Sequence, residues 1–294
     1  MAGNRYLTCA STASAPLVAA GAGFTLVELL VVIAIAAITT AVIYSFFPAQ
    51  YKVISDQEAV SEMQQQLRAA MKIISTEIKM AGHNPNHSST DSDGIDNDAD
   101  GFIDEDNESG CASAISRAEW NLFSFTLDSN SDGDCRDPND NISYFIQEDN
   151  HGRPNLRRAT TSSSQTIAAN IQVLGFAYAF DNDGDHQLDK DASGTGTVWA
   201  IDTDGDGRLD LNLDTNHDGQ VNQDDDPAGE PLATAVPLDR TRAVAIWLLA
   251  RTKSPDSRHL NTETYSVANQ RITTNDGYRR RLLSTIAYLR NMGL

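Results

Sequence analysis

Gly23-Phe24-Thr25-Leu26-Val27-Glu28 opens a 24-residue run, Phe24 to Phe47, in which Glu28 is the one charged residue. About 20 apolar residues in a helix cross the hydrocarbon core of a bilayer, so this run is long enough for a membrane span. A carboxylate inside such a helix costs roughly 2.5–3.5 kcal/mol on insertion scales. We therefore expect a positively charged partner for Glu28. Cleavage after Gly23 would supply one, the free α-amine of Phe24 on a neighbouring copy.

These residues resemble the class III signal of type IV pilins and type II secretion pseudopilins. The match consists of Gly23, Phe24, Glu28 and the apolar stretch 29–35. The resemblance implies cleavage by prepilin peptidase after Gly23, N-methylation of Phe24, and assembly with other pilins or pseudopilins into a helical filament. It also implies insertion in the inner membrane before assembly. Afterwards the chain would lie in a pilus at the cell surface, or in the periplasm for a pseudopilin. Segment 1–23 would be the removed leader, and a translation start further downstream remains an alternative.

The second half of the expected helix is amphipathic. Its apolar residues recur at steps of three and four, which places them on one face; they are Ile54, Val60, Met63, Leu67, Met71, Ile74 and Ile78. Pro48 is expected to kink the helix, because proline removes one backbone hydrogen bond. Gly82 is expected to end it in a left-handed conformation. We assign 24–82 to a transmembrane and assembly helix.

Residues 83–294 are expected to form an extracytoplasmic, β-rich head. Short apolar runs alternate there with turns, which is typical of antiparallel strands; the runs are 122–127, 142–147, 156–159, 171–180, 197–201, 243–252 and 281–289. Asp149-Asn150-His151-Gly152 predicts a hairpin turn, and Thr160–Thr166 predicts a loop. The expected fold class is α+β, a long pilin-like helix packed on an antiparallel sheet with acidic loop inserts.

The later part of the chain resembles PilW-type minor pilins. The matching residues are Asp276-Gly277-Tyr278, Arg280 and Arg281, Leu289-Arg290-Asn291, Ile167–Ile171 and Tyr178-Ala179-Phe180. The resemblance implies a low-abundance subunit that helps to start or cap a type IV pilus. A type II secretion pseudopilin shares much of this layout and stays an alternative.

Acidic residues are concentrated in four segments of the chain. The net charge is −19, and 28 of the 41 acidic residues lie in 91–108, 128–140, 181–191 and 202–226. This charge argues against a nucleic-acid partner, because phosphate binding needs clustered Lys and Arg.

Within these segments, oxygen-bearing side chains recur at every second position before a glycine, as in calcium-binding loops. The loops resemble those of dockerins and thrombospondin type 3 repeats. The expected ligands of the first loop are Asp96, Asp98, Asp100, Phe102 and Asp104, those of the second Asp202, Asp204, Asp206, Arg208 and Asp210, and those of the third Asp214, Asn216, Asp218, Gln220, Asn222 and Asp225. Phe102, Arg208 and Gln220 would contribute backbone carbonyls at the seventh place.

Two further copies match less well. One consists of Asp181, Asp183, Asp185 and Asp189, with His186 at the sixth place and Gly184 out of register. The other begins at Asp128, and its ninth place is Arg136. Five candidate loops predict roughly two to five Ca²⁺ ions that stabilise the head, since millimolar extracellular calcium fills even weak sites. The alternative is a solvated Asp/Gly tract without metal.

Cys111 and Cys135 remain after the leader is removed, and an extracytoplasmic head favours a disulfide between them over two free thiols. The sequence contains no G-x-S-x-G, H-E-x-x-H or phosphate-binding motif, so we expect no enzyme. An assembly ATPase would then be a separate protein that acts on this chain only indirectly. A calcium-dependent, pilus-borne adhesin is the remaining alternative, and deletion of 202–226 would separate an adhesive role from a structural one.

Overall fold

The computed structural model describes residues 23–84, 114–133, 135, 137–191 and 193–292. The chain divides into two compact units, Met1–Ile54 and Ser55–Leu294. Helix α1 (Leu26–Ile78) contributes to both units and is continuous through position 48. The expected kink at Pro48 stays a prediction.

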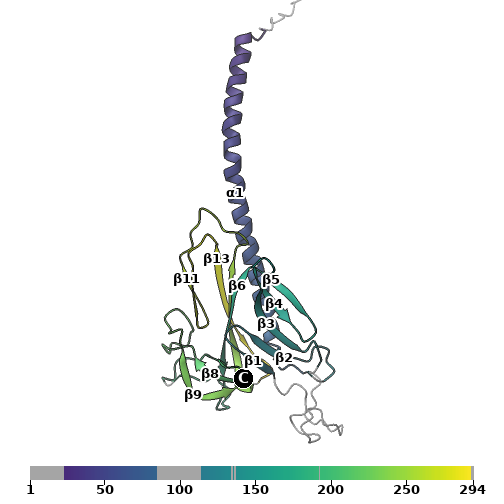
Figure 1. Cartoon of the computed structure of the whole chain (residues 1–294), viewed down its shortest axis with the longest axis vertical. Helices are drawn as coiled ribbons and strands as arrows, with labels where there is room; N and C mark the ends of the chain where they lie inside the picture. The colour runs from purple at the N-terminus through teal and green to yellow at the C-terminus, as the bar shows by residue number, and fades with distance from the viewer. Residues whose placement is uncertain (1–22, 85–113, 134, 136, 192, 293–294) are drawn as a thin grey trace, which may run out of the picture. The chain divides into compact units, whose positions relative to one another are not determined.

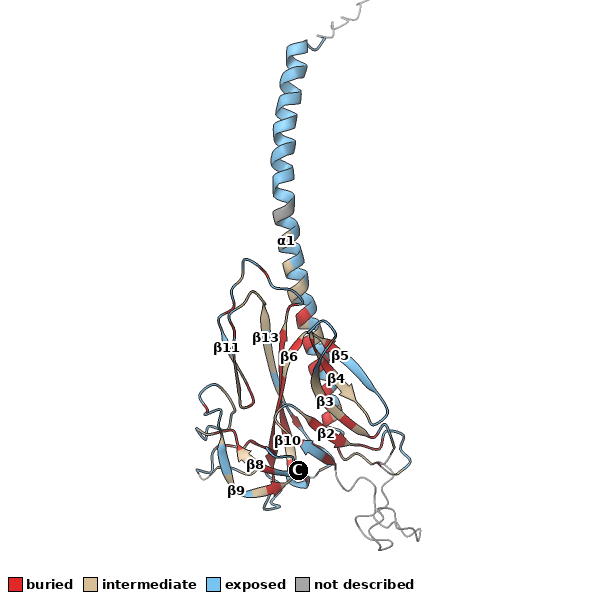
Figure 2. Ribbon diagram, viewed as in Figure 1, coloured by how far each residue is buried: buried red, intermediate tan, exposed pale blue. Residues whose placement is uncertain are grey.

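The part of α1 in the second unit packs through one stripe of side chains. Met63, Leu67, Met71, Ile74 and Ile78 are all buried, as their spacing predicts (Figure 2). The prediction was wrong for Ile54, which lies before this stripe and is exposed. The stripe begins only at Val60, which is half-buried against the core.

The helix ends earlier than its capping glycine. After Ile78 the chain forms a turn, and Gly82 adopts a φ of +71°, the left-handed conformation expected for it. Its amide donates a hydrogen bond to the carbonyl of Thr126 at 2.8 Å. The capping glycine thus joins the end of α1 to a strand of the head.

The head contains two larger antiparallel sheets and one hairpin (Figure 1). The five-stranded sheet has the order β1 (Ile115–Ala118), β2 (Phe123–Thr126), β3 (Asn141–Glu148), β4 (Pro154–Ala159), β5 (Ser164–Ala169). The six-stranded sheet has the order β13 (Arg280–Tyr288), β10 (Thr241–Arg251), β6 (Ile171–Phe180), β7 (Ala200–Ile201), β8 (Arg208–Asn212), β9 (Glu230–Pro237). The separate hairpin pairs β11 (Thr264–Val267) with β12 (Gln270–Thr273), and a 3₁₀ turn, η1 (Leu238–Arg240), precedes β10.

One hydrophobic core joins the helix stripe to both larger sheets. In β2 and β3, Phe123, Phe125, Ile142 and Tyr144 are buried, because alternate residues of a strand share one face. β6 and β10 are buried along most of their length, which explains their continuous apolar sequences. The α+β architecture expected from the sequence is confirmed.

A carboxylate of α1 forms hydrogen bonds to two side chains of the five-stranded sheet. The hydroxyl of Tyr144 donates a hydrogen bond to Glu77 Oε2 at 2.5 Å, and Arg158 Nε donates to the same oxygen at 2.8 Å. Burial raises the pKa of Tyr144, and its hydrogen bond to Glu77 adds to the shift. The Glu77 carboxylate therefore accepts hydrogen bonds from side chains of both β3 and β4.

Several strands are absent from the sequence prediction. The expected loop Thr160–Thr166 was wrong in its second half, because β5 begins at Ser164 and pairs with β4. The strands β1, β8, β9, β11 and β12 were not predicted. The hairpin turn at Asp149–Gly152 is confirmed, with Gly152 at a φ of +68°.

Candidate metal centre and assembly motif

The start of α1 carries the predicted assembly motif, and Thr25 and Glu28 form a capping box there. Thr25 Oγ1 accepts the backbone N–H of Glu28 at 3.2 Å, and Glu28 Oε2 accepts the backbone N–H of Thr25 at 2.9 Å. The Thr25 hydroxyl also donates to Glu28 Oε2 at 3.0 Å. Glu28 thus has a local role within one chain, and Gly23 and Phe24 precede the helix.

The N-terminal part of α1 contains a segment long and apolar enough to cross a membrane. No residue of that segment is buried inside the structure. The side chains of Leu29, Val31, Ile33 and Ile35 are all more than half exposed, as expected for a helix that lipid or neighbouring helices cover.

Four acidic loops of the head share one hydrogen-bond pattern at their first aspartate. Asp128, Asp181, Asp202 and Asp214 are all buried. One carboxylate oxygen of each accepts backbone N–H groups from the fourth or fifth residue, and the other accepts the N–H of the sixth. In Asp202, for example, Oδ1 accepts Gly205 N–H at 2.7 Å and Oδ2 accepts Gly207 N–H at 3.0 Å.

The third residue of each of these loops follows the same rule. Its side-chain oxygen accepts the N–H of the fifth residue, as Asp204 Oδ1 does from Asp206 at 3.2 Å. The equivalent bonds join Asp132 to Asn130, Asp185 to Asp183, and Asp218 to Asn216. The weaker sequence copies therefore have the same local conformation as the stronger ones.

Two positions in each of these four loops are left-handed. The fourth residues, Ser131, Gly184, Gly205 and His217, have φ values of 62°, 77°, 76° and 59°. The sixth residues, Gly133, His186, Gly207 and Gly219, have φ values of 100°, 64°, 85° and 80°. Gly184, which seemed out of register in the sequence, occupies the fourth place, where glycine removes the steric cost of a positive φ.

An acid closes each loop by accepting the N–H of the second residue. Asp189 accepts from Asn182 at 3.1 Å and Asp210 from Thr203 at 3.1 Å. Asp225 accepts from Thr215 at 2.9 Å, and Asp140 accepts from Ser129 at 3.0 Å. Sequence reasoning missed Asp140, which is fully buried, because it lies one residue beyond the expected twelfth place.

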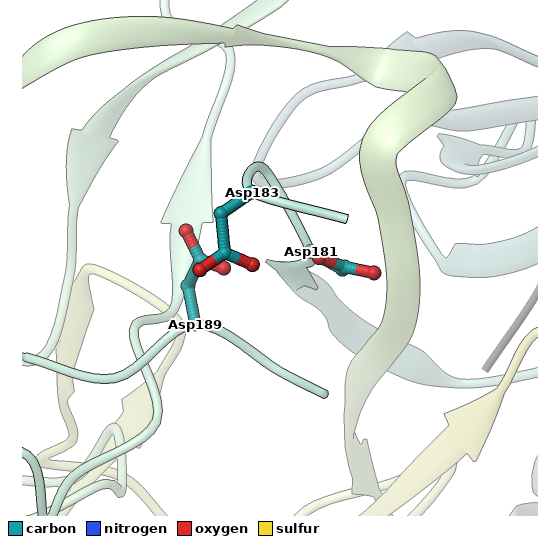
Figure 3. Close-up of side chains that lie close together, drawn as sticks. All are labelled: Asp181, Asp183 and Asp189. Atoms are coloured by element: carbon teal, nitrogen blue, oxygen red, sulfur yellow. The ribbon is translucent and has the colours of Figure 1, made fainter. Parts of the chain in front are cut away.

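Three carboxylates converge in two of the loops. The groups are Asp181, Asp183 and Asp189 (Figure 3), and Asp202, Asp204 and Asp206; in each, one oxygen per residue lies within 4.8 Å of the others. Oxygen-only ligand sets of this kind suit a hard divalent cation. Both groups could hold a metal ion.

In the first of these triads, the neighbouring negative charges affect the pKa of Asp189. Burial raises the pKa of Asp189, and the negative charges of Asp183 and Asp181 add to the shift, although the N–H of Asn182 opposes it. A cation at this triad would remove the repulsion.

The other predicted ligands have different positions. Asp185 has one carboxylate oxygen bound to the N–H of Gln187 and lies outside the first triad. Asp210 closes its loop and lies outside the second triad. The loop from Asp214 to Asp225, the best match by sequence, contains no such triad in the described part of the chain.

Asp214 and Asp225 nevertheless interact electrostatically. Burial raises the pKa of Asp214, and the charge of Asp225 contributes in the same direction. Around them, Asn216 and Asn222 both hydrogen-bond to Asp218, and Gln220 donates its N–H to that residue.

The remaining predicted ligands lie outside the described residues. They are Asp96, Asp98, Asp100, Phe102 and Asp104, and Cys111 is outside as well. Cys135 is buried and disulfide-bonded. Its pairing with Cys111 stays a prediction.

A related loop, which shares the first turn but not the left-handed sixth residue, was missed because its third and fifth places are hydroxyls. Asp191 Oδ1 accepts the N–H groups of Thr195 at 3.2 Å and Gly196 at 3.4 Å, and Ser193 Oγ accepts the N–H of Thr195 at 3.4 Å. Gly194, at the fourth place, has a φ of +74°. Hydroxyls at alternate positions between Asp191 and a glycine would have revealed this copy.

Comparisons with known proteins agree with the motifs at both ends of the chain. Residues 143–291 match the family described as type IV pilus-assembly protein W, and residues 20–44 match the prokaryotic N-terminal methylation motif. No match was found among curated proteins. Among solved structures, a type IV-like pilin from Thermus thermophilus aligns with 79% of this chain and 98% of its own, at 11% identity and a TM-score of 0.37.

Proposed function

Because the chain belongs to the type IV pilus-assembly protein W family, a family of structural pilin proteins and not of enzymes, we propose that it works as a minor pilin that primes or joins a filament. The segment Phe24–Phe47 holds it in the inner membrane before assembly, and prepilin peptidase cleaves after Gly23. The N-terminal methylation motif supports this processing. The pilus-assembly family favours a pilus over a secretion pseudopilin.

Glu28 carries the assembly proposal. It is the one charge in the apolar run, and among the described residues its carboxylate accepts hydrogen bonds from Thr25 alone. A carboxylate in the membrane is stabilised far better by a positive charge than by neutral donors. We propose that the methylated amine of Phe24 on a neighbouring subunit pairs with Glu28 and sets the axial register of the two copies.

Three variants separate this charge from the helix cap. Glu28→Gln keeps an acceptor for the Thr25 N–H but removes the charge, Glu28→Ala removes both, and Thr25→Ala removes the cap but leaves the charge. We expect prepilin peptidase to cleave all three variants. Thr25→Ala should enter filaments at close to the wild-type level. The two Glu28 variants should be incorporated at least about tenfold less than the wild type, as expected for the loss of an interaction above 1.4 kcal/mol.

The measurement is immunoblotting of sheared pili together with mass spectrometry of the N-terminus. Incorporation of Glu28→Gln at the wild-type level would overturn the charge-pairing role. Native protein that still carries residues 1–23 would overturn the pilin proposal itself.

We further propose that Ca²⁺ occupies the acidic loops and stabilises the head. The two carboxylate triads supply oxygen ligands that Ca²⁺ prefers, and the shared loop conformation extends this role to the loops that begin at Asp128 and Asp214. Bound cations would cancel the like-charge repulsion, so metal binding would contribute directly to folding. The loop at 96–104 and the disulfide Cys111–Cys135 belong to the same proposal.

A further inference from the structure

A pocket of about 610 Å³ opens in the head where the five-stranded sheet meets β6 and β12. Its lining comes from the segment 117–124, from β3 and β4, from residues 172–174, and from Ile272. This volume lies within the range of about 300–1,000 Å³ that small-ligand sites occupy. The pocket contains none of the acidic-loop residues.

The pocket lies on the side of β2 and β3 that faces away from the core. Phe123 and Tyr144 are fully buried in the core, whereas their strand neighbours Ser124 and Ser143 line the pocket. The two serine hydroxyls are 2.7 Å apart and hydrogen-bond across the strands. The floor of the pocket is therefore polar and held in place by the sheet.

Apolar surface and free polar groups alternate around this floor. Trp120, Phe145 and Ile272 are half-buried and supply apolar walls. Asn121 is exposed, and its amide has no partner among the described residues. Gln172 uses its amide oxygen to accept Arg280 Nε at 2.7 Å, which leaves its amide N–H groups as donors.

The two charges of the pocket neutralise each other. Arg117 and Glu119 form an ion pair at 3.4 Å, with side-chain exposures of 54% and 30%. A phosphate or carboxylate ligand would have to compete with Glu119, and a cationic ligand with Arg117. Charge complementarity therefore favours an uncharged ligand.

We propose that this pocket binds a neutral sugar ring. A pyranose presents an apolar C–H face and a rim of hydroxyls, and the pocket pairs an indole and a phenyl ring with amide, carboxylate and hydroxyl groups that can bond such a rim. This role goes beyond a structural subunit and would give the filament a glycan-binding head.

Trp120 provides the reporter for the test. The other two tryptophans, Trp199 and Trp247, are 4% and 8% exposed and lie in the core, so a ligand in the pocket should shift the indole resonance of Trp120 alone. The processed full-length chain is studied in a detergent without a sugar headgroup. Glucose, galactose and N-acetylglucosamine are titrated separately, with glucuronic acid and glucosamine as charged counterparts.

We expect a saturable shift of the Trp120 indole N–H with at least one neutral sugar, and weaker binding of its charged counterpart. Trp120→Ala, followed by sugar-dependent thermal shift, should abolish binding. Asn121→Ala changes only an exposed side chain and should weaken binding about fivefold, as expected for the loss of one neutral hydrogen bond. Tyr288→Ala removes an exposed aromatic ring outside the pocket and should bind like the wild type.

The proposal is overturned if no neutral sugar shifts this resonance, if Asn121→Ala binds as the wild type does, or if a charged sugar binds more tightly. A shift that a short peptide produces and the sugars do not would assign the pocket to a protein partner instead. Filament incorporation of Asn121→Ala should stay normal, which keeps this test separate from the assembly proposal.

Discussion

Two loops of the head begin with the same turn but differ at their sixth residue and in their chemistry, because Gly207 has a positive φ and Gly196 does not. In the loops that begin at Asp191 and Asp202, the first aspartate accepts backbone N–H groups and the fourth residue is a left-handed glycine, at φ values of 74° and 76°. The loop from Asp191 carries hydroxyls at its third and fifth places, Ser193 and Thr195. The loop from Asp202 carries carboxylates at the same two places.

The two loops differ in whether their side chains can donate hydrogen bonds to the first aspartate. Ser193 Oγ donates to Asp191 Oδ1 at 2.7 Å and lies 2.6 Å from Thr195 Oγ1, so protein hydrogens satisfy this oxygen, whereas Asp191 Oδ2 is buried without a hydrogen-bond partner among the described residues. Ionised carboxylates have no hydrogen to donate, and three of them converge in the next loop. We therefore expect the shared first turn to be stabilised by hydroxyls in one loop and by a cation in the other, according to the third and fifth residues.

Removal of calcium should produce the largest effect. The head fragment Ser55–Leu294 retains every residue of the hydrophobic core. Calcium at about 100 times its Kd would stabilise it by roughly 2.7 kcal/mol for each site. Two filled triads would therefore raise its Tm by about 10 °C or more, since 1 kcal/mol corresponds to roughly 2–4 °C at this size.

Differential scanning calorimetry of this fragment in EDTA, Ca²⁺ and Mg²⁺ measures the effect. Mg²⁺ should recover much less of the Tm, because it prefers a rigid octahedron with fewer protein ligands. The same melting curve in EDTA and in Ca²⁺ would contradict structural calcium.

Exchange of the two loop chemistries should produce the next largest effect. Asp204→Ser with Asp206→Thr gives the loop from Asp202 the hydroxyls of its neighbour. In Ca²⁺ the variant should lose about 2–3 kcal/mol, the contribution of one filled site. In EDTA it should be more stable than the wild type, because two repelling charges are gone.

Urea unfolding in both buffers gives the two differences in the free energy of unfolding. Glu148→Ser with Asp239→Ser removes two exposed acids outside the acidic loops and serves as the charge-matched control. If this control reproduces both changes, net charge and not the triad is responsible.

Loss of the hydroxyl donor should have a smaller effect that does not depend on calcium. Ser193→Ala removes the hydrogen bond to Asp191 Oδ1, and a typical hydrogen bond contributes about 1 kcal/mol. The same decrease is expected in Ca²⁺ and in EDTA. A loss confined to the calcium buffer would show that the loop from Asp191 also holds a cation.

The loops also show what the sequence reveals and what it does not. Aspartates at alternate places predicted the loops from Asp181 and Asp202, where carboxylates converge. The loop from Asp191 was missed because it has one carboxylate, whereas its first turn requires only acceptors at alternate places and a residue that tolerates a positive φ. Asp140 was missed because the distance from the first aspartate to the closing acid differs between the loops.

The fold was predictable where apolar residues follow a period or form a long run. The stripe from Met63 to Ile78 and the strands β6 and β10 belong to this class. Half of the residues of β9 are exposed and β5 begins with three exposed polar residues, so the apolar signal of both is weak, and pairing with their neighbours makes them strands.

The smallest effect concerns a carboxylate whose partners all belong to the protein. Asp149 accepts the backbone N–H groups of Arg153 and His151 and pairs with the Arg153 guanidinium at 2.8 Å. The N–H of Arg153 is the main reason that its pKa falls from 3.8 to about 2. A carboxyl whose pKa is lower in the folded state stabilises that state at a pH above its unfolded pKa, and this contribution is lost as the pH falls through its folded pKa.

The Tm difference between wild type and Asp149→Asn should therefore be constant above about pH 5 and shrink between about pH 4 and pH 2. Calcium should not change this profile, in contrast to the acidic loops, because hydrogen bonds already satisfy this carboxylate. A profile that moves with calcium would remove the distinction between acids that the protein satisfies and acids that require a cation.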